Sequence, residues 1–77
     1  MALYKHGHHL AQSHHEAFDT PLTPGTIAAY PGVYRCIVCG DEIGIAKGHA
    51  LPPQNHHQHA VSQGPIRWQL TVCAVQR

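Results

Sequence analysis

The residues in this sequence best suited to chemistry are a pair of cysteines, Cys36 and Cys39, followed by a run of histidines. Two residues separate the cysteines, so one tight turn can aim both sulfurs at the same ion. Sixteen residues intervene before the run that contains His56, His57 and His59. A structural zinc ion takes four tetrahedral ligands, with sulfur and nitrogen as its preferred donors. The pattern therefore predicts one structural Zn²⁺ held by both cysteines and two of these histidines.

The choice among the histidines follows from the strand period. If residues 57–61 form a strand, His57 and His59 share one face. We therefore rank His59 first, His57 next and His56 as the replacement for His57. His49 is a further alternative as the fourth ligand, although its place in a turn favours a surface role.

The elements that must position these ligands are short strands joined by turns. A Pro-Gly pair at 31–32 precedes a segment rich in β-branched and aromatic residues at 33–38, which predicts a strand. Gly40 can take the left-handed conformation that closes a turn after the cysteines. Residues 41–46 are then expected to form the return strand of a hairpin, and 47–48 a second turn.

The clearest strand signal covers residues 66–72, which alternate between apolar and polar side chains. The apolar positions of this strand are expected to line the core: Ile66, Trp68, Leu70 and Val72. Pro52 and Pro53 cannot continue a helix, so the histidine run is expected on a loop or strand rather than on the helix of a helical zinc finger. Cys73 is interpreted as a partly covered thiol rather than a ligand.

The composition describes one small, nearly neutral domain. The chain has 77 residues, with nine histidines, three cysteines, five Lys or Arg and four Asp or Glu. A hydrophobic core of this size contributes only about 3–5 kcal/mol to the stability of the fold, so a bound metal ion that adds stability is expected. The near-zero charge gives no electrostatic case for DNA or an acidic membrane. No apolar run is long enough for a membrane helix, and no secretory signal is evident, so we expect a reducing, cytoplasmic location.

The chain is expected to divide at about Thr20. Residues 1–20 carry five histidines and few large apolar groups, which favours a flexible, His-rich arm. A short helix over residues 9–18 is an alternative, because Leu10 and Phe18 recur at helical spacing, although helices of this length are marginal alone. Residues 21–77 are expected to form the folded, mostly-β domain.

One stretch resembles small bacterial zinc-ribbon proteins of uncharacterised function. The resemblance covers roughly residues 24–72 and rests on the Gly-Val-Tyr-Arg-Cys-Ile-Val-Cys-Gly segment that ends at Gly40, the Lys-Gly turn and Leu-Pro-Pro. In those relatives a second cysteine pair follows the prolines. This chain has Gln54 and His57 at those positions, so the resemblance implies a zinc ribbon in which a neighbour such as His59 completes the site.

These features predict a binding module that is not an enzyme. Four filled protein ligands leave zinc no open position for water, and no catalytic motif is present. The expected partner is an unidentified protein, with a monomeric chain. A nucleic-acid partner has only weak support from a few scattered basic and aromatic side chains: Arg35, Lys47, Arg67, Tyr34 and Trp68. Two alternatives are metal buffering or sensing by the histidine-rich segments, and redox chemistry at Cys36 and Cys39.

Overall fold

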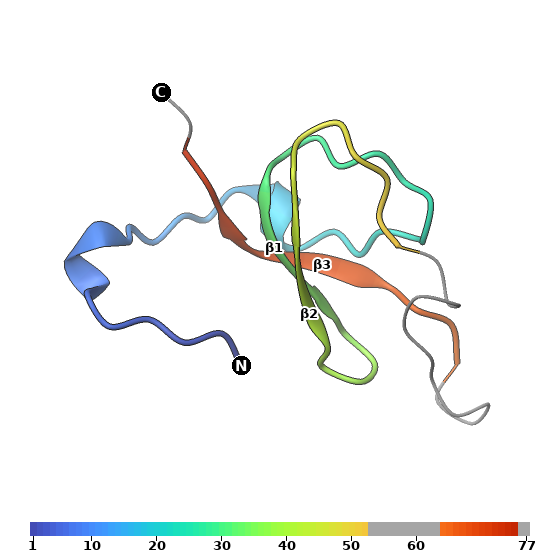
Figure 1. Cartoon of the computed structure of the whole chain (residues 1–77), viewed down its shortest axis with the longest axis horizontal. Coiled ribbons are helices and arrows are strands. Elements are labelled where there is room, and N and C mark those ends of the chain that lie inside the picture. The colour runs from blue at the N-terminus through green and yellow to red at the C-terminus, as the bar shows by residue number, and fades with distance from the viewer. Residues whose placement is uncertain (53–63, 76–77) are drawn as a thin grey trace.

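A computed structural model describes residues 1–52 and 64–75, and three antiparallel strands form its centre (Figure 1). The strands are β1 (Gly32–Cys36), β2 (Glu42–Ile45) and β3 (Trp68–Cys73). Their order in the sheet is β2-β1-β3, so the central strand is the one that ends at the first cysteine. The expectation of a small, mostly-β fold is confirmed.

The hairpin of β1 and β2 forms where the sequence predicts it. Gly32 pairs with Ile45 and Arg35 pairs with Glu42, so the two strands run in register up to the cysteine turn. Gly40 closes that turn with φ of 85°, a conformation that glycine adopts without steric cost. Both strands are shorter than predicted, because the residues after Cys36 already belong to the turn.

The last strand shifts register against β1 by one residue. Val33 pairs with Val72 and the next residue, Tyr34, pairs with Leu70, which leaves Thr71 as the extra residue on β3. The Thr71 hydroxyl donates to the Val33 carbonyl at 2.9 Å. An extra residue reverses the inward and outward alternation beyond it. The prediction that Val72 lies in the core is therefore wrong, and this residue is 36% exposed.

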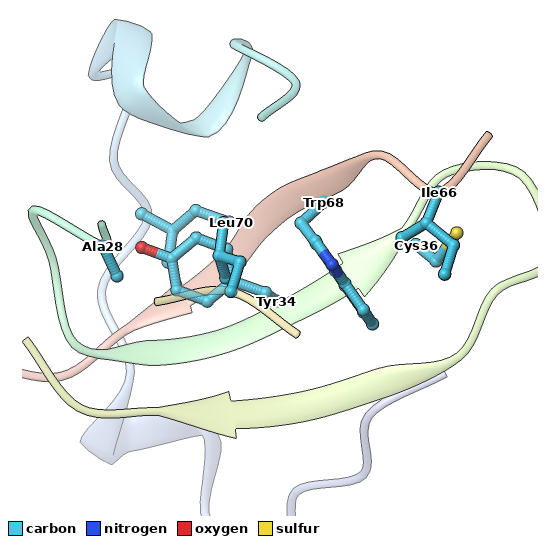
Figure 2. Packing of buried hydrophobic residues seen from close by; sticks show 7 residues of the cluster. Ala28, Tyr34, Cys36, Ile66, Trp68 and Leu70 are labelled. Carbon is cyan, nitrogen blue, oxygen red and sulfur yellow. The ribbon is translucent and has the colours of Figure 1, made fainter. Parts of the chain in front are cut away.

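The core lies against this sheet and is small (Figure 2). The indole of Trp68 is fully buried and its Nε1 donates to the Pro52 carbonyl at 3.2 Å. The buried Tyr34 hydroxyl donates to the Tyr30 carbonyl at 2.7 Å. Both large aromatic groups thus keep a hydrogen bond while they are buried. The buried hydrophobic cluster in the described part of the chain is Ala28, Tyr34, Cys36, Leu51, Ile66, Trp68 and Leu70.

Two isolated bridges hold the loops against the sheet. Leu22 and Trp68 exchange backbone hydrogen bonds of 2.7 and 2.8 Å, which covers part of the outer edge of β3. Ile27 and Ala50 form the second bridge through the bonds of their neighbours: the Ala28 N–H donates to the His49 carbonyl and the Leu51 N–H to the Thr26 carbonyl, both at 2.9 Å. The segment before β1 therefore lies beside the segment after β2. The loops therefore complete the core that three short strands alone cannot enclose.

The N-terminal arm contains two single turns of 3₁₀ helix and no longer helix. The first turn, η1 (Gly7–His9), lies within an exposed stretch that runs from residue 1 to residue 16. The alternative of a helix over residues 9–18 is wrong. A helix this short gains little from its own hydrogen bonds, and here no sheet face supports it along its length.

The second turn, η2 (Glu16–Phe18), returns the arm to the sheet. Ala17 and Phe18 are partly buried against the core cluster, and the side-chain amide of Gln69 donates to the Phe18 carbonyl at 2.7 Å. Packing against the sheet thus begins a few residues before Thr20. Within the described ranges, no helix has the length and apolar character needed to cross a membrane.

Candidate metal centre

The two cysteines lie at one end of the sheet, where β1 runs into its turn. Cys36 is the last residue of β1 and is buried, whereas Cys39 is exposed in the turn. The Gly40 N–H donates to the Cys36 carbonyl at 2.8 Å, and the Ile37 N–H donates to the Arg67 carbonyl at 3.0 Å. The turn is therefore held both from within and by the residue that precedes β3. Both side chains are thiols rather than a disulfide.

The Cys36 sulfur is surrounded by donors. Burial raises the pKa of the Cys36 thiol, but hydrogen bonds from the backbone N–H groups of Cys39, Arg67 and Val38, and from the Cys39 thiol, lower it to about 6. Thiolate is the form of cysteine that binds metals. The fold thus prepares one anionic sulfur at neutral pH, with donors from the turn and from the segment before β3.

The Cys39 thiol has the opposite tendency. Burial raises the pKa of Cys39, and its hydrogen bond to Cys36 and the neighbouring negative charge raise it further. The backbone N–H of Asp41 donates to the Cys39 sulfur and lowers this pKa, but the net shift is upward. Without a metal ion the pair therefore carries one negative charge and one shared proton. A divalent cation at this place would replace that proton and favour the second thiolate.

Of the predicted ligands, the structure brings Cys36 and Cys39 together. His56, His57 and His59 lie outside the described residues. His49 follows the turn beyond β2, at the opposite end of that strand from the cysteines. Across residues 1–52 and 64–75, no three His, Cys, Asp or Glu side chains are gathered as a metal site. His49 therefore gains no support as the fourth ligand.

The described residues on either side of the histidine run are held at the cysteine end of the sheet. Trp68 pairs with Cys36 in the sheet, and its indole N–H donates a hydrogen bond to the Pro52 carbonyl. The Arg67 N–H reaches the Cys36 sulfur. Arg67 comes eight positions after His59, and a chain of eight such steps spans up to about 26–29 Å. Chain length therefore permits the predicted histidines to reach the cysteines.

Sequence reasoning missed the contribution of Arg67. Arg67 contributes its backbone N–H, a group that every residue except proline carries, so the residue type gives no signal for it. The position of this N–H depends on the pairing of β1 with β3. Cys73, by contrast, is a partly covered thiol as expected. It lies at the far end of β3, because Cys73 pairs with Gly32 while Trp68 pairs with Cys36.

The lowered pKa of Cys36 predicts that stability rises with pH. In the folded protein this pKa is about 6, against an ordinary value of 9.0. Between about pH 7 and 8 the unfolded chain then holds a proton on Cys36 that the folded chain lacks. Each such proton makes the free energy of unfolding rise by about 1.4 kcal/mol per pH unit. Urea unfolding of the purified protein at several pH values measures this slope.

The slope of the free energy of unfolding against pH also depends on how many of the two cysteines are thiolates in the folded protein. One thiolate in the folded state gives the slope above, and a metal-bound pair gives about twice that value. The Cys73→Ser variant should keep the slope of the parent, because Cys73 lies at the far end of β3 from the cysteine turn. A free energy of unfolding that does not change over this pH range would show that Cys36 is an ordinary thiol in the folded protein.

The comparisons with known proteins identify one similarity. The chain is 51% identical over 49 residues to Protein L of Escherichia coli, an alignment that covers 64% of this chain and 55% of that protein. The chain thus spans about half the length of the curated relative it matches. No family model matches the chain, and no solved structure matches it. The relative's name states neither a ligand nor a reaction.

Proposed function

We propose that the chain is a zinc-stabilised β domain of the zinc-ribbon type and acts as an interaction module. Cys36, Cys39 and His59 supply three ligands, and His57 or its neighbour His56 supplies the fourth. The observation that carries this proposal is the convergence of backbone N–H groups on the Cys36 sulfur. Such donors orient a thiolate and tune its charge, which is what a metal ligand needs from its surroundings.

The size of the core supports a metal staple. Three strands of four to six residues and a small buried cluster form the described fold. A domain near this length gains only about 3–5 kcal/mol from its core alone. A structural zinc ion contributes about 10–16 kcal/mol of apparent folding free energy in small peptides. The free energy of zinc binding is therefore large enough to determine whether this domain folds.

Redox chemistry at the same pair is less favoured by the arrangement of the thiols. A dithiol catalyst needs its low-pKa cysteine accessible to the substrate disulfide. Here the cysteine whose pKa is lowered, Cys36, is fully buried, and the exposed one, Cys39, has a raised pKa. The accessible sulfur is thus the poorer nucleophile at neutral pH.

A protein partner fits the surface better than nucleic acid. Ile37 lies in the cysteine turn and is 44% exposed, so the metal-stabilised tip presents an apolar group. Arg35, one of the few basic residues, lies 3.7 Å from the Glu42 carboxylate, which offsets its charge. The chain carries a net charge of only +1, and phosphate contacts require a denser set of cations.

The test is the metal content of the protein and its variants. Native mass spectrometry of the untagged chain should find one tightly bound zinc ion. Cys36→Ser and His59→Ala should lose it, whereas the matched controls Cys73→Ser and His49→Ala should keep it. His57→Ala and His56→Ala then identify the fourth ligand. A folded protein without zinc, or a Cys73→Ser variant that loses zinc as readily as Cys36→Ser, would contradict the proposal.

A further inference from the structure

The first turn of the N-terminal arm carries a compact group of three imidazoles. The ring centroids of His6 and His8 lie 5.7 Å apart, those of His6 and His9 6.0 Å apart, and those of His8 and His9 4.2 Å apart. All three side chains are exposed. They are far along the chain from the cysteine turn and have no part in the site described above.

The backbone of η1 fixes this grouping. The His9 N–H donates to the His6 carbonyl at 3.0 Å, and the Leu10 N–H donates to the Gly7 carbonyl at 3.0 Å. Side chains three residues apart eclipse one another in a 3₁₀ turn, which places His6 and His9 on one side. The ring of Tyr4 lies against the same turn, because a Cβ built on Gly7 would meet its Cε2 at 3.1 Å.

The ring separations are close to those of imidazoles that share one metal ion. A metal at 2.0–2.1 Å from a ring nitrogen lies about 3.2 Å from the ring centroid, so two such rings at tetrahedral or octahedral angles have centroids roughly 4.5–5.3 Å apart. The observed values lie within about 1 Å of this range. As placed, no three such side chains in the described ranges form a ready-made site, but exposed rings need only rotate about their own bonds to converge.

The donor set selects a class of ion. Residues 1–15 contain no Asp, Glu or Cys, so the ligands available at this turn are imidazole nitrogens and water. Imidazole suits late first-row divalent ions, whereas Mg²⁺ and Ca²⁺ require oxygen ligands. We propose that His6, His8 and His9 form a labile surface site for a late first-row divalent cation such as Ni²⁺, Cu²⁺ or Zn²⁺. Three protein ligands leave the remaining positions to water, so the ion exchanges readily.

The arm offers a matched comparison. The Nδ1 of His15 accepts a hydrogen bond from the Ala17 N–H at 3.0 Å and caps η2, and its ring lies 5.9 Å from that of Tyr30. His15 is thus engaged with the folded domain. His14 belongs to the same exposed arm but lies outside η1. His14→Ala therefore removes one arm histidine and leaves the proposed site complete.

Isothermal titration of the purified full chain with Ni²⁺ tests the proposal. The parent should bind one Ni²⁺ ion that the His6→Ala/His8→Ala/His9→Ala variant does not bind. Loss of the outer partner of a metal ligand already weakens metal binding by about 10–100-fold, so each single variant, which loses a ligand itself, should weaken binding by about tenfold or more. His14→Ala should bind like the parent. Unchanged Ni²⁺ binding by the triple variant, or equal weakening by His14→Ala, would overturn the proposal.

Discussion

Removal of zinc is expected to unfold the domain. If one zinc ion joins the cysteine turn to the histidine run, its loss removes an apparent free energy of about 10–16 kcal/mol, which exceeds the 3–5 kcal/mol or so that a core of this size supplies. A strong chelator should abolish the β-sheet signal in circular dichroism. Addition of Zn²⁺ should restore that signal, because the thiols remain reduced.

The cysteines provide the control for this experiment. Cys36→Ser should already be unfolded before chelation, since a hydroxyl in this place is a poor ligand for zinc. Cys73→Ser should be folded and should unfold with the chelator like the parent, because Cys73 lies at the far end of β3 from the cysteine turn. A parent protein that keeps the same melting temperature with and without chelator would contradict a structural role for zinc.

The hairpin could be predicted from the sequence because its signals are local. A Pro-Gly pair before β1, a glycine after the second cysteine and a Lys-Gly turn after β2 each act over a few residues. The positive φ of Gly40 and Gly48, 85° and 87°, agrees with their expected places in turns. Local turn chemistry thus defined where β1 and β2 begin and end to within a residue or two.

Features that depend on distant pairing could not be predicted in this way. Val72 fits the alternation of its own segment, but its direction depends on the register shift between β3 and β1. The same pairing brings the Arg67 N–H to the Cys36 sulfur. The order β2-β1-β3 likewise places the cysteine strand at the centre, which no local signal in the sequence indicates. The apolar and polar alternation of a segment predicts that it forms a strand, but it does not predict which strand it pairs with or in which register.

Gly32→Ala is expected to disrupt the sheet itself. Gly32 has φ of 152°, and a Cβ on it would lie 1.9 Å from the Val72 carbonyl oxygen and 3.0 Å from the Cys73 Cα. These atoms belong to the backbone of β3, which cannot swing aside as a side chain does. Relief of the clash requires β1 and β3 to separate where Gly32 pairs with Cys73. We expect a loss of about 3 kcal/mol or more in the free energy of unfolding, measured by urea denaturation.

Gly44→Ala is the matched control for this change, because Gly44 is a strand glycine in β2 with no heavy atom within 4 Å of a built Cβ. Alanine in a strand interior avoids the conformational entropy that glycine loses, so this variant should be about 0.5–1 kcal/mol more stable than the parent. The two variants add the same methyl group to neighbouring strands and should shift stability in opposite directions. Equal stability of the two would mean that β3 does not approach Gly32 closely, and the placement of Arg67 beside Cys36, which depends on the same strand pairing, would then lose its basis.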